Sequence, residues 1–397
     1  MGDVPQMGPG FPFPGGFDFS QLMRMLQSQG PVNLDVARQV AGVIATSNPQ
    51  TGEPGAEPPI DRDANATFEQ LVSAAQNAVG DATGIVEVLS VATRTVDRQQ
   101  WSATTLDALG PVLESLAAAL GRTPPPDPDA PPAEGGEDAM FGFLMQSLMP
   151  VLLGVWSGWM IGQLSHQSLG QYDLPLPLAG PPTLLFVARN VDEFSDAWSL
   201  PSDELRYALV LRETVHGAQR SIPWVRDRLS RLAGEYVGAY EMNPEALESQ
   251  LGELDFTNPE AMQSLGGFAD AGALLGAMQS PRQVPLLEEL QRFVSVLEGY
   301  ADVVVATVGA RMVSAHERID EALRRHRLER GDAAAFVDRL LGLELERRHY
   351  DEGAAFCRGV IERAGLDGLN RLWVGEHMVP TRPELEAPGL WLARIEL

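Results

Sequence analysis

Residues 140–164 contain no charged side chain, and this stretch limits the folds that are open to the chain. A helix of this length must be covered on all sides, either by lipid or by protein. Gly154, Gly158 and Gly162 recur at every fourth position, which allows a partner helix to approach closely. Pro150 and the absence of a flanking basic cluster disfavour a membrane span. We therefore expect a buried core helix here and regard a membrane partner as the weaker alternative.

Most other apolar residues recur three and four positions apart, which is the period of an amphipathic helix. The best strand pattern is a short β-prone run that follows a pair of prolines. The sequence therefore predicts a mainly α fold with a small β element. The expected helices cover residues 21–45, 68–79, 83–96, 101–120, 201–220, 284–308, 314–328, 333–341 and 350–364, and the expected strand covers residues 183–188.

Proline, glycine and acidic residues mark the expected domain boundaries. Residues 1–20 form a Gly/Pro-rich leader that we expect to be disordered, and residues 21–121 form an N-terminal helical region. Residues 122–139 read as a stiff acidic linker, because prolines this dense cannot continue a helix. Residues 140–397 then form the helical domain that carries the candidate site.

The chain is strongly acidic, which bears on its partners. Its 29 basic residues are all Arg and face 54 acidic residues, giving a net charge of −25. Nucleic acids and anionic membranes require cationic surface, so the composition disfavours both as partners. Cys357 is the only cysteine and lies in an apolar helical pattern, where we expect it in the core. No secretory signal pattern is present, and we expect a cytoplasmic protein.

One predicted helix nearly carries a zinc-peptidase motif. Such enzymes use H-E-x-x-H, with two imidazole ligands one helical turn apart and a catalytic Glu beside the first. Here the sequence reads R-E-T-V-H, with Arg212 at the first ligand position, followed by Glu213 and His216. A guanidinium has no acceptor lone pair and is permanently charged, so Arg212 cannot bind a cation. Glu and His at this spacing also occur by chance, so the motif alone is weak.

A second short pattern, H-E-x-x-D from His316 to Asp320, also places possible ligands one turn apart. Ser314 and Glu317 explain it more simply as a capping box at a helix start. His326 lies among arginines, and we expect it on a solvated surface together with His349.

Several motifs in a fixed order carry a resemblance to a known family. The chain resembles an actinobacterial zincin-like metallopeptidase family, whose members are commonly labelled as hydrolases or as associated with deazaflavin-coenzyme biosynthesis. The resemblance covers most of the chain apart from its linkers. The matching stretches are 30–33 (G-P-V-N), 170–173 (G-Q-Y-D), the helix with Glu213, His216 and A-Q at 218–219, 223–229 (P-W-V-R-D-R-L), 297–302 (L-E-G-Y-A-D), 350–356 (Y-D-E-G-A-A-F), 368–373 (G-L-N-R-L-W) and 388–394 (P-G-L-W-L-A-R).

The resemblance implies a zincin-like fold, zinc as the cofactor and specific roles for single residues. Glu213 matches the catalytic general base and His216 the second zinc ligand. Glu298 matches the Glu of a later E-G-H motif and is a candidate third ligand. Two positions depart from the family pattern: Arg212 replaces the first His, and Tyr300 replaces the His of E-G-H.

These departures leave three interpretations. The first is a degenerate, catalytically inactive pseudo-peptidase with little or no bound zinc, which holds a peptide or protein in its cleft. In it, Arg212 replaces the metal electrostatically and pairs with Glu213 or Glu298. The second is an active zinc hydrolase with His216, Glu298 and a further carboxylate such as Asp302 as ligands. The third is a structural helical protein whose motif residues serve only in packing.

Overall fold

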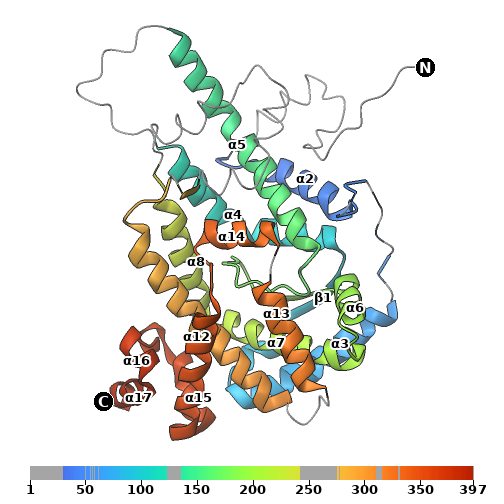
Figure 1. Ribbon diagram of the computed structural model, residues 1–397, viewed down its shortest axis with the longest axis vertical. Helices are drawn as coiled ribbons and strands as arrows, with labels where there is room; N and C mark the ends of the chain where they lie inside the picture. Colours follow the sequence, from blue (N-terminus) through green and yellow to red (C-terminus); the bar gives the residue numbers. More distant parts are fainter. Residues whose placement is uncertain are drawn as a thin grey trace.

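The computed structural model describes residues 30–49, 51–53, 55, 57, 59–60, 62–122, 136–241, 275–276, 278–309, 315–329 and 331–396. Helices form most of this part of the chain (Figure 1). The predicted fold class, mainly α with a small β element, is confirmed. The helices are α2 (Leu34–Thr46), α3 (Arg62–Thr83), α4 (Arg98–Leu120), α5 (Gly136–Ser165), α6 (Ala188–Ala197), α7 (Ser202–Ser221), α8 (Pro223–Gly238), α12 (Gln283–Gly309), α13 (His316–Leu328), α14 (Asp332–Leu341), α15 (Arg347–Asn370), α16 (Arg382–Glu386) and α17 (Pro388–Glu396).

The β element is a parallel pair of short strands, β1 (Ala92–Val96) and β2 (Thr183–Val187). Ala92 lies opposite Thr183, and the pairing continues in register to the end of both strands. The four residues of β2 after Thr183 are fully buried, as expected for an apolar strand covered by helices. The strand predicted at residues 183–188 is therefore confirmed.

The helix predicted at residues 83–96 is wrong. Gly84 adopts a φ of +72°, a left-handed conformation that ends α3 without a Cβ penalty. A short 3-10 helix, η1 (Val86–Ser90), follows and leads into β1. The β-branched residues of β1 suit a strand once the buried partner β2 is available. This tertiary pairing outweighed the helical spacing of the apolar residues.

The uncharged segment forms α5, which packs against α2 and α4. A Cβ added at Gly154 would lie 2.4 Å from the Asn33 carbonyl oxygen, and one added at Gly158 would lie 2.3 Å from that of Ala37. Helix α2 therefore packs closely against the glycine face of α5, as the spacing of the glycines predicts. Within the described residues, no helix combines the length and apolar character needed to cross a membrane.

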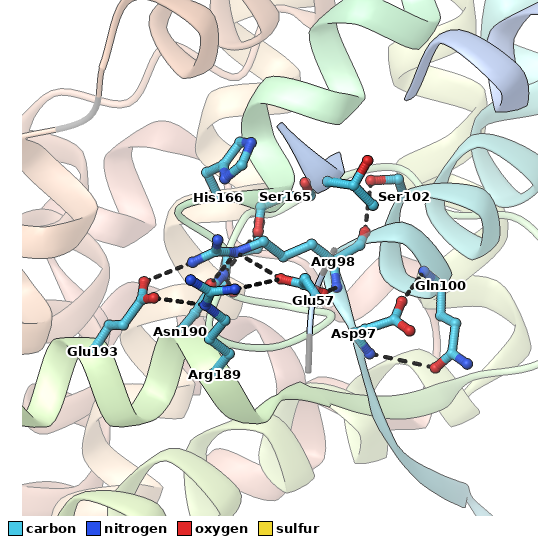
Figure 2. Close-up of polar contacts among 12 residues, drawn as sticks. Glu57, Asp97, Arg98, Gln100, Ser102, Ser165, His166, Arg189, Asn190 and Glu193 are labelled. Carbon is cyan, nitrogen blue, oxygen red and sulfur yellow. Dashed lines mark hydrogen bonds and ion pairs between the residues drawn. The ribbon is translucent and has the colours of Figure 1, made fainter. Parts of the chain in front are cut away.

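A buried arginine ties α4, α5 and α6 together at the strand pair (Figure 2). Arg98 is 5% exposed and donates from Nε to Asn190 Oδ1 (2.7 Å) and from Nη2 to Glu193 Oε2 (2.6 Å). The backbone N–H of Arg98 donates to Glu57 Oε2 (2.9 Å). Asn190 in turn donates to the Ser165 carbonyl at the end of α5 (2.7 Å). The buried charge is thus paired and hydrogen-bonded on several sides, as burial of a guanidinium requires.

The motif lies on α7, whose observed bounds agree closely with the predicted 201–220. This helix packs on α3 and on α12, the helix of Glu298. The expected contact with α12 is confirmed, whereas the expected packing on α5 is replaced by packing on α3, because the glycine face of α5 is taken by α2.

The predicted division of the chain concerns residues that the structure describes only in part. The leader 1–20 and residues 123–135 of the linker lie outside the described residues, so these assignments stay predictions. Described residues from both sides of the linker contribute to one hydrophobic core, in which Phe68 of α3 stacks on Phe186 of β2. Cys357 is fully buried in this core, as predicted.

Candidate functional site

The motif residues occupy the most buried part of α7. Glu213 and His216 are each 1% exposed and Arg212 is 8% exposed. Arg212 and His216 are four residues apart and therefore share a face of the helix. Burial of an acid, a base and a guanidinium on one helix requires partners for each of them.

The partners of Arg212 are two carboxylates of α12. Its Nη2 lies 2.6 Å from Glu298 Oε2 and its Nη1 lies 2.5 Å from Asp302 Oδ1. Glu298 and Asp302 are one turn apart on α12, so both face α7. The sequence suggested Glu213 or Glu298 as the partner of Arg212. In the structure, Arg212 pairs with Glu298 and also with Asp302. Burial alone would disfavour the charge of Arg212, but Asp302 and Glu298 outweigh it and raise the pKa of the guanidinium.

A second arginine reaches the same carboxylates from α13. Arg327 Nη1 lies 3.4 Å from Glu298 Oε2 and 3.3 Å from Asp302 Oδ1, and its guanidinium lies over the Tyr350 ring at 5.5 Å. Burial acts to raise the pKa of Glu298, but the permanent positive charges of Arg212 and Arg327 lower it. The pair of carboxylates is thus held ionised by two arginines.

Glu213 faces a different partner, the loop that precedes β2. Its Oε2 accepts a hydrogen bond from the backbone N–H of Tyr172 (2.8 Å). A Cβ at Gly170 would lie 2.5 Å from the Glu213 carboxyl carbon, so only glycine allows the loop to approach this closely. Trp101 fixes the loop by donating from Nε1 to the Gly170 carbonyl (3.0 Å). Burial raises the pKa of Glu213 to about 8, although the Tyr172 N–H opposes the shift.

His216 keeps one ring nitrogen without a hydrogen-bond partner. Gln219 donates from Nε2 to the Leu297 carbonyl (2.9 Å), so its Oε1 faces His216 Nδ1 at 3.0 Å and Nδ1 carries the proton. His216 Nε2 then holds a lone pair, which lies 3.7 Å from Glu298 Oε1 and has no hydrogen-bond partner among the described residues. Burial lowers the pKa of His216 to about 4, so the imidazole is neutral at pH 7.

The structure does not bring Tyr300 to this site. Residues two apart on a helix lie about 200° apart around its axis, so Tyr300 faces away from Glu298. Its hydroxyl donates to Asn370 Oδ1 (2.7 Å), and its ring meets Trp373 edge-on with centroids 4.7 Å apart. Tyr300 is therefore a core residue with a satisfied hydroxyl.

Two residues of the site were missed by the sequence interpretation. Arg327 is next to His326 in a run of arginines for which the sequence predicts a solvated surface, and no local pattern indicates that it reaches α12. Arg220 lies four residues after His216, a spacing that could have drawn attention to it. It is 3% exposed, and its Nε and Nη1 have no hydrogen-bond partner in the described part of the chain. Its guanidinium lies 5.8 Å from the Tyr172 ring centre, and burial lowers its pKa.

The other histidines differ from expectation. His349 was predicted on the surface, but it is 6% exposed, and its Nδ1 accepts the Glu346 N–H (3.0 Å) at the start of α15. His326 is partly buried, with Nε2 3.0 Å from Asp173 Oδ2. For the second motif, α13 begins at His316 after an N-cap at Ala315. The capping box predicted with Ser314 as the N-cap is therefore wrong, because an N-cap at Ala315 moves Glu317 out of the third helical position.

Comparison with known proteins identifies the family. The family model for zincin-like metallopeptidases matches residues 32–392, which is nearly the whole chain. The chain belongs to this family. A solved structure from Chloroflexus aurantiacus, described as a "putative hydrolase with a novel fold", matches with a TM-score of 0.58 and 22% identity, covering 92% of this chain and 99% of that one. At this identity the match shows a shared fold only. No curated protein matches the chain.

The family implies a catalytic zinc ion, which normally has three protein ligands and one water. His216 Nε2 and Glu298 offer two donors, and the orphaned lone pair of His216 would suit a metal. The place of the third donor is taken by the guanidinium of Arg212, which binds the carboxylates itself. In the described ranges, no three His, Cys, Asp or Glu side chains converge as a metal site. The residues present therefore do not fit the catalytic zinc of the family.

Proposed function

We propose that this chain is a zincin-like metallopeptidase-family protein that does not cleave peptides and acts by binding a peptide or protein. The observation that carries the proposal is the Arg212 guanidinium, bonded to both Glu298 and Asp302 on the face where the family carries its first imidazole. A permanently charged guanidinium supplies the positive charge of a metal without its ability to activate water.

The state of Glu213 supports the same proposal. A general base in a zinc peptidase must be ionised to take a proton from metal-bound water. Burial raises the pKa of Glu213 to about 8, and one of its oxygens is occupied by the Tyr172 N–H. At pH 7 the carboxyl is mostly neutral and is better suited to hold the loop before β2 than to act as a base.

One observation favours the alternative of a working zinc hydrolase. His216 Nε2 has no hydrogen-bond partner among the described residues and lies beside Glu298. With Asp302 as a third donor, these residues could form an unusual ligand set only if Arg212 left its two carboxylates. Breaking a buried pair of this kind costs about 3–5 kcal/mol, which disfavours this arrangement.

The test is zinc content, measured by mass spectrometry after incubation with zinc and removal of free metal. Wild type is expected to retain no stoichiometric zinc. Arg212→His restores H-E-x-x-H beside Glu298 and is expected to take up about one zinc per chain. Arg212→His combined with His216→Ala is the matched control and should lose that zinc. Stoichiometric zinc in the wild type would contradict the proposal and favour the working hydrolase.

A further inference from the structure

A cavity of about 550 Å³ lies directly beside the Arg212 site. Its walls come from α7, α12, α13 and α15, which lie in one part of the molecule (Figure 1). Arg212 and Asp302 contribute to its lining, and Arg327 contributes from α13. The cavity is of the size that small-molecule and peptide-end sites have in proteins.

The charge of this cavity differs from that of the rest of the chain. Its lining includes five arginines and four carboxylates, whereas the whole chain has 29 basic and 54 acidic residues. When the buried Glu298 behind the lining is counted, arginines and carboxylates balance. An anion that is repelled by a molecule of net charge −25 therefore meets no net repulsion here.

The arginines of the cavity lining also carry N–H donors that no acceptor in the described ranges uses. Each guanidinium carries five N–H donors. Arg327 donates from Nη1 to Glu298 and Asp302, and its Nη2 makes no hydrogen bond within the described residues. Arg358 is exposed at the cavity wall and forms no ion pair within the described part of the chain. Unused N–H donors of buried and cavity-lining arginines are suited to planar carboxylate oxygens.

Apart from Thr307 and Tyr350, the remaining lining is apolar and comes mainly from α12 and α13. Val303, Ile319, Leu323 and Leu328 contribute to it, and Ile361 adds to it from α15. A ligand that fills the cavity therefore gains from burying an apolar body next to its charged group.

The geometry points to this cavity as a binding site for a carboxylate on an apolar body, such as the C-terminal end of a peptide. Arg358 and Arg327 supply the donors, and the Arg212–Asp302 pair contributes to the lining of the site. This assignment rests on the proposed function, because it names what a family member without peptidase activity would hold. The proposed site requires an anionic ligand, since a neutral ligand leaves the N–H donors of the arginines without acceptors.

The test is calorimetric titration of the full chain with N-acetyl-leucine, N-acetyl-leucinamide and inorganic phosphate. N-acetyl-leucine is expected to bind saturably with a Kd of about 1 mM or tighter. The amide has the same apolar body without the charge and is expected to bind roughly tenfold more weakly or not at all. Phosphate distinguishes a carboxylate site from a general oxyanion site, and phosphate binding tighter than N-acetyl-leucine would overturn the assignment.

Two pairs of variants locate the binding. Arg358→Gln and Arg327→Gln are each expected to weaken N-acetyl-leucine binding roughly tenfold. Arg363→Gln on α15 and Arg325→Gln on α13 are the matched controls, because neither residue lines the cavity. They should bind within about twofold of wild type. Since Arg358 is exposed and forms no ion pair with other described residues, its replacement should leave the fold intact.

No saturable binding by wild type, equal binding of the amide, or equal loss in the control variants would each overturn the site. Zinc content of the same samples separates this result from the proposed function. A zinc-free wild type that binds no carboxylate contradicts the site alone, whereas a zinc-loaded wild type contradicts the proposed function.

Discussion

Arg212 changes the chemistry of its helix by a single substitution of residue type. An imidazole at this position would offer a lone pair to a metal, whereas the guanidinium offers only donors and a fixed charge. Glu298 and Asp302 accept those donors at 2.6 and 2.5 Å, so carboxylates that could bind a cation are neutralised within the protein. Burial raises the pKa of Glu213 to about 8, so this carboxyl is mostly protonated at pH 7.

The pKa of Glu213 predicts a pH dependence of stability. The folded chain holds this proton up to a pKa of about 8, while the ordinary value of 4.5 applies when the chain is unfolded. The folded state therefore binds more protons between these values, and the free energy of unfolding falls as pH rises through them, by up to about 1.4 kcal/mol per pH unit. Glu213→Gln cannot titrate and lacks this slope.

Urea unfolding of both proteins at pH 5 and pH 8 checks this expectation. Wild type should lose stability relative to Glu213→Gln on going to pH 8. His216 contributes with the opposite sign below pH 6.5, since its folded pKa is about 4, but that contribution is common to both proteins. A difference between the two proteins that does not change with pH would show that Glu213 is ionised in the folded chain.

The close contact between helices α5 and α2 depends on glycines, which have no side chain. The two helices meet where Gly154, Gly158 and Gly162 expose the backbone of α5. The recurrence of these glycines at every fourth position predicts a close helix contact, and in the structure the partner is α2. The partner itself was not predictable, because any apolar helix could satisfy the same face.

Gly158→Ala is expected to destabilise this helix pair. Its Cβ would lie 2.3 Å from the Ala37 carbonyl oxygen, so the helices must separate, at a cost of about 1–3 kcal/mol. Gly238→Ala on α8 is the matched control, because no atom lies within 4 Å of its added Cβ. Thermal unfolding should show a lowered Tm for the first variant and an unchanged or slightly raised Tm for the second. Equal Tm values for the two variants would mean that α2 and α5 are not closely packed.

At the scale of the whole molecule, the sequence predicts local features better than it predicts contacts between distant segments. Apolar periodicity locates most helices, and the ordered motifs place Glu298 on a helix that faces α7. The contact of Arg327 with α12 could not be predicted in this way, because it depends on how α13 is placed relative to α12 in the folded chain. Tyr300 could have been excluded, since its position two residues after Glu298 turns it to another side of the helix.

In the proposed function, Arg212 stabilises the chain by neutralising Glu298 and Asp302 in place of a metal ion. A double-mutant cycle of Arg212→Met and Glu298→Gln, measured by urea unfolding, tests this stabilisation. Arg212→Met is expected to lose about 3–5 kcal/mol, because the buried Glu298 and the partly exposed Asp302 lose their main counter-charge. The double variant should lose clearly less than the sum of the single variants, with a coupling of about 0.5–3 kcal/mol. Arg206→Met is the control on the same helix, since Arg206 pairs with the exposed Asp192 and should contribute about 1 kcal/mol or less. Additive losses in the cycle, or an Arg212→Met variant as stable as Arg206→Met, would contradict the account.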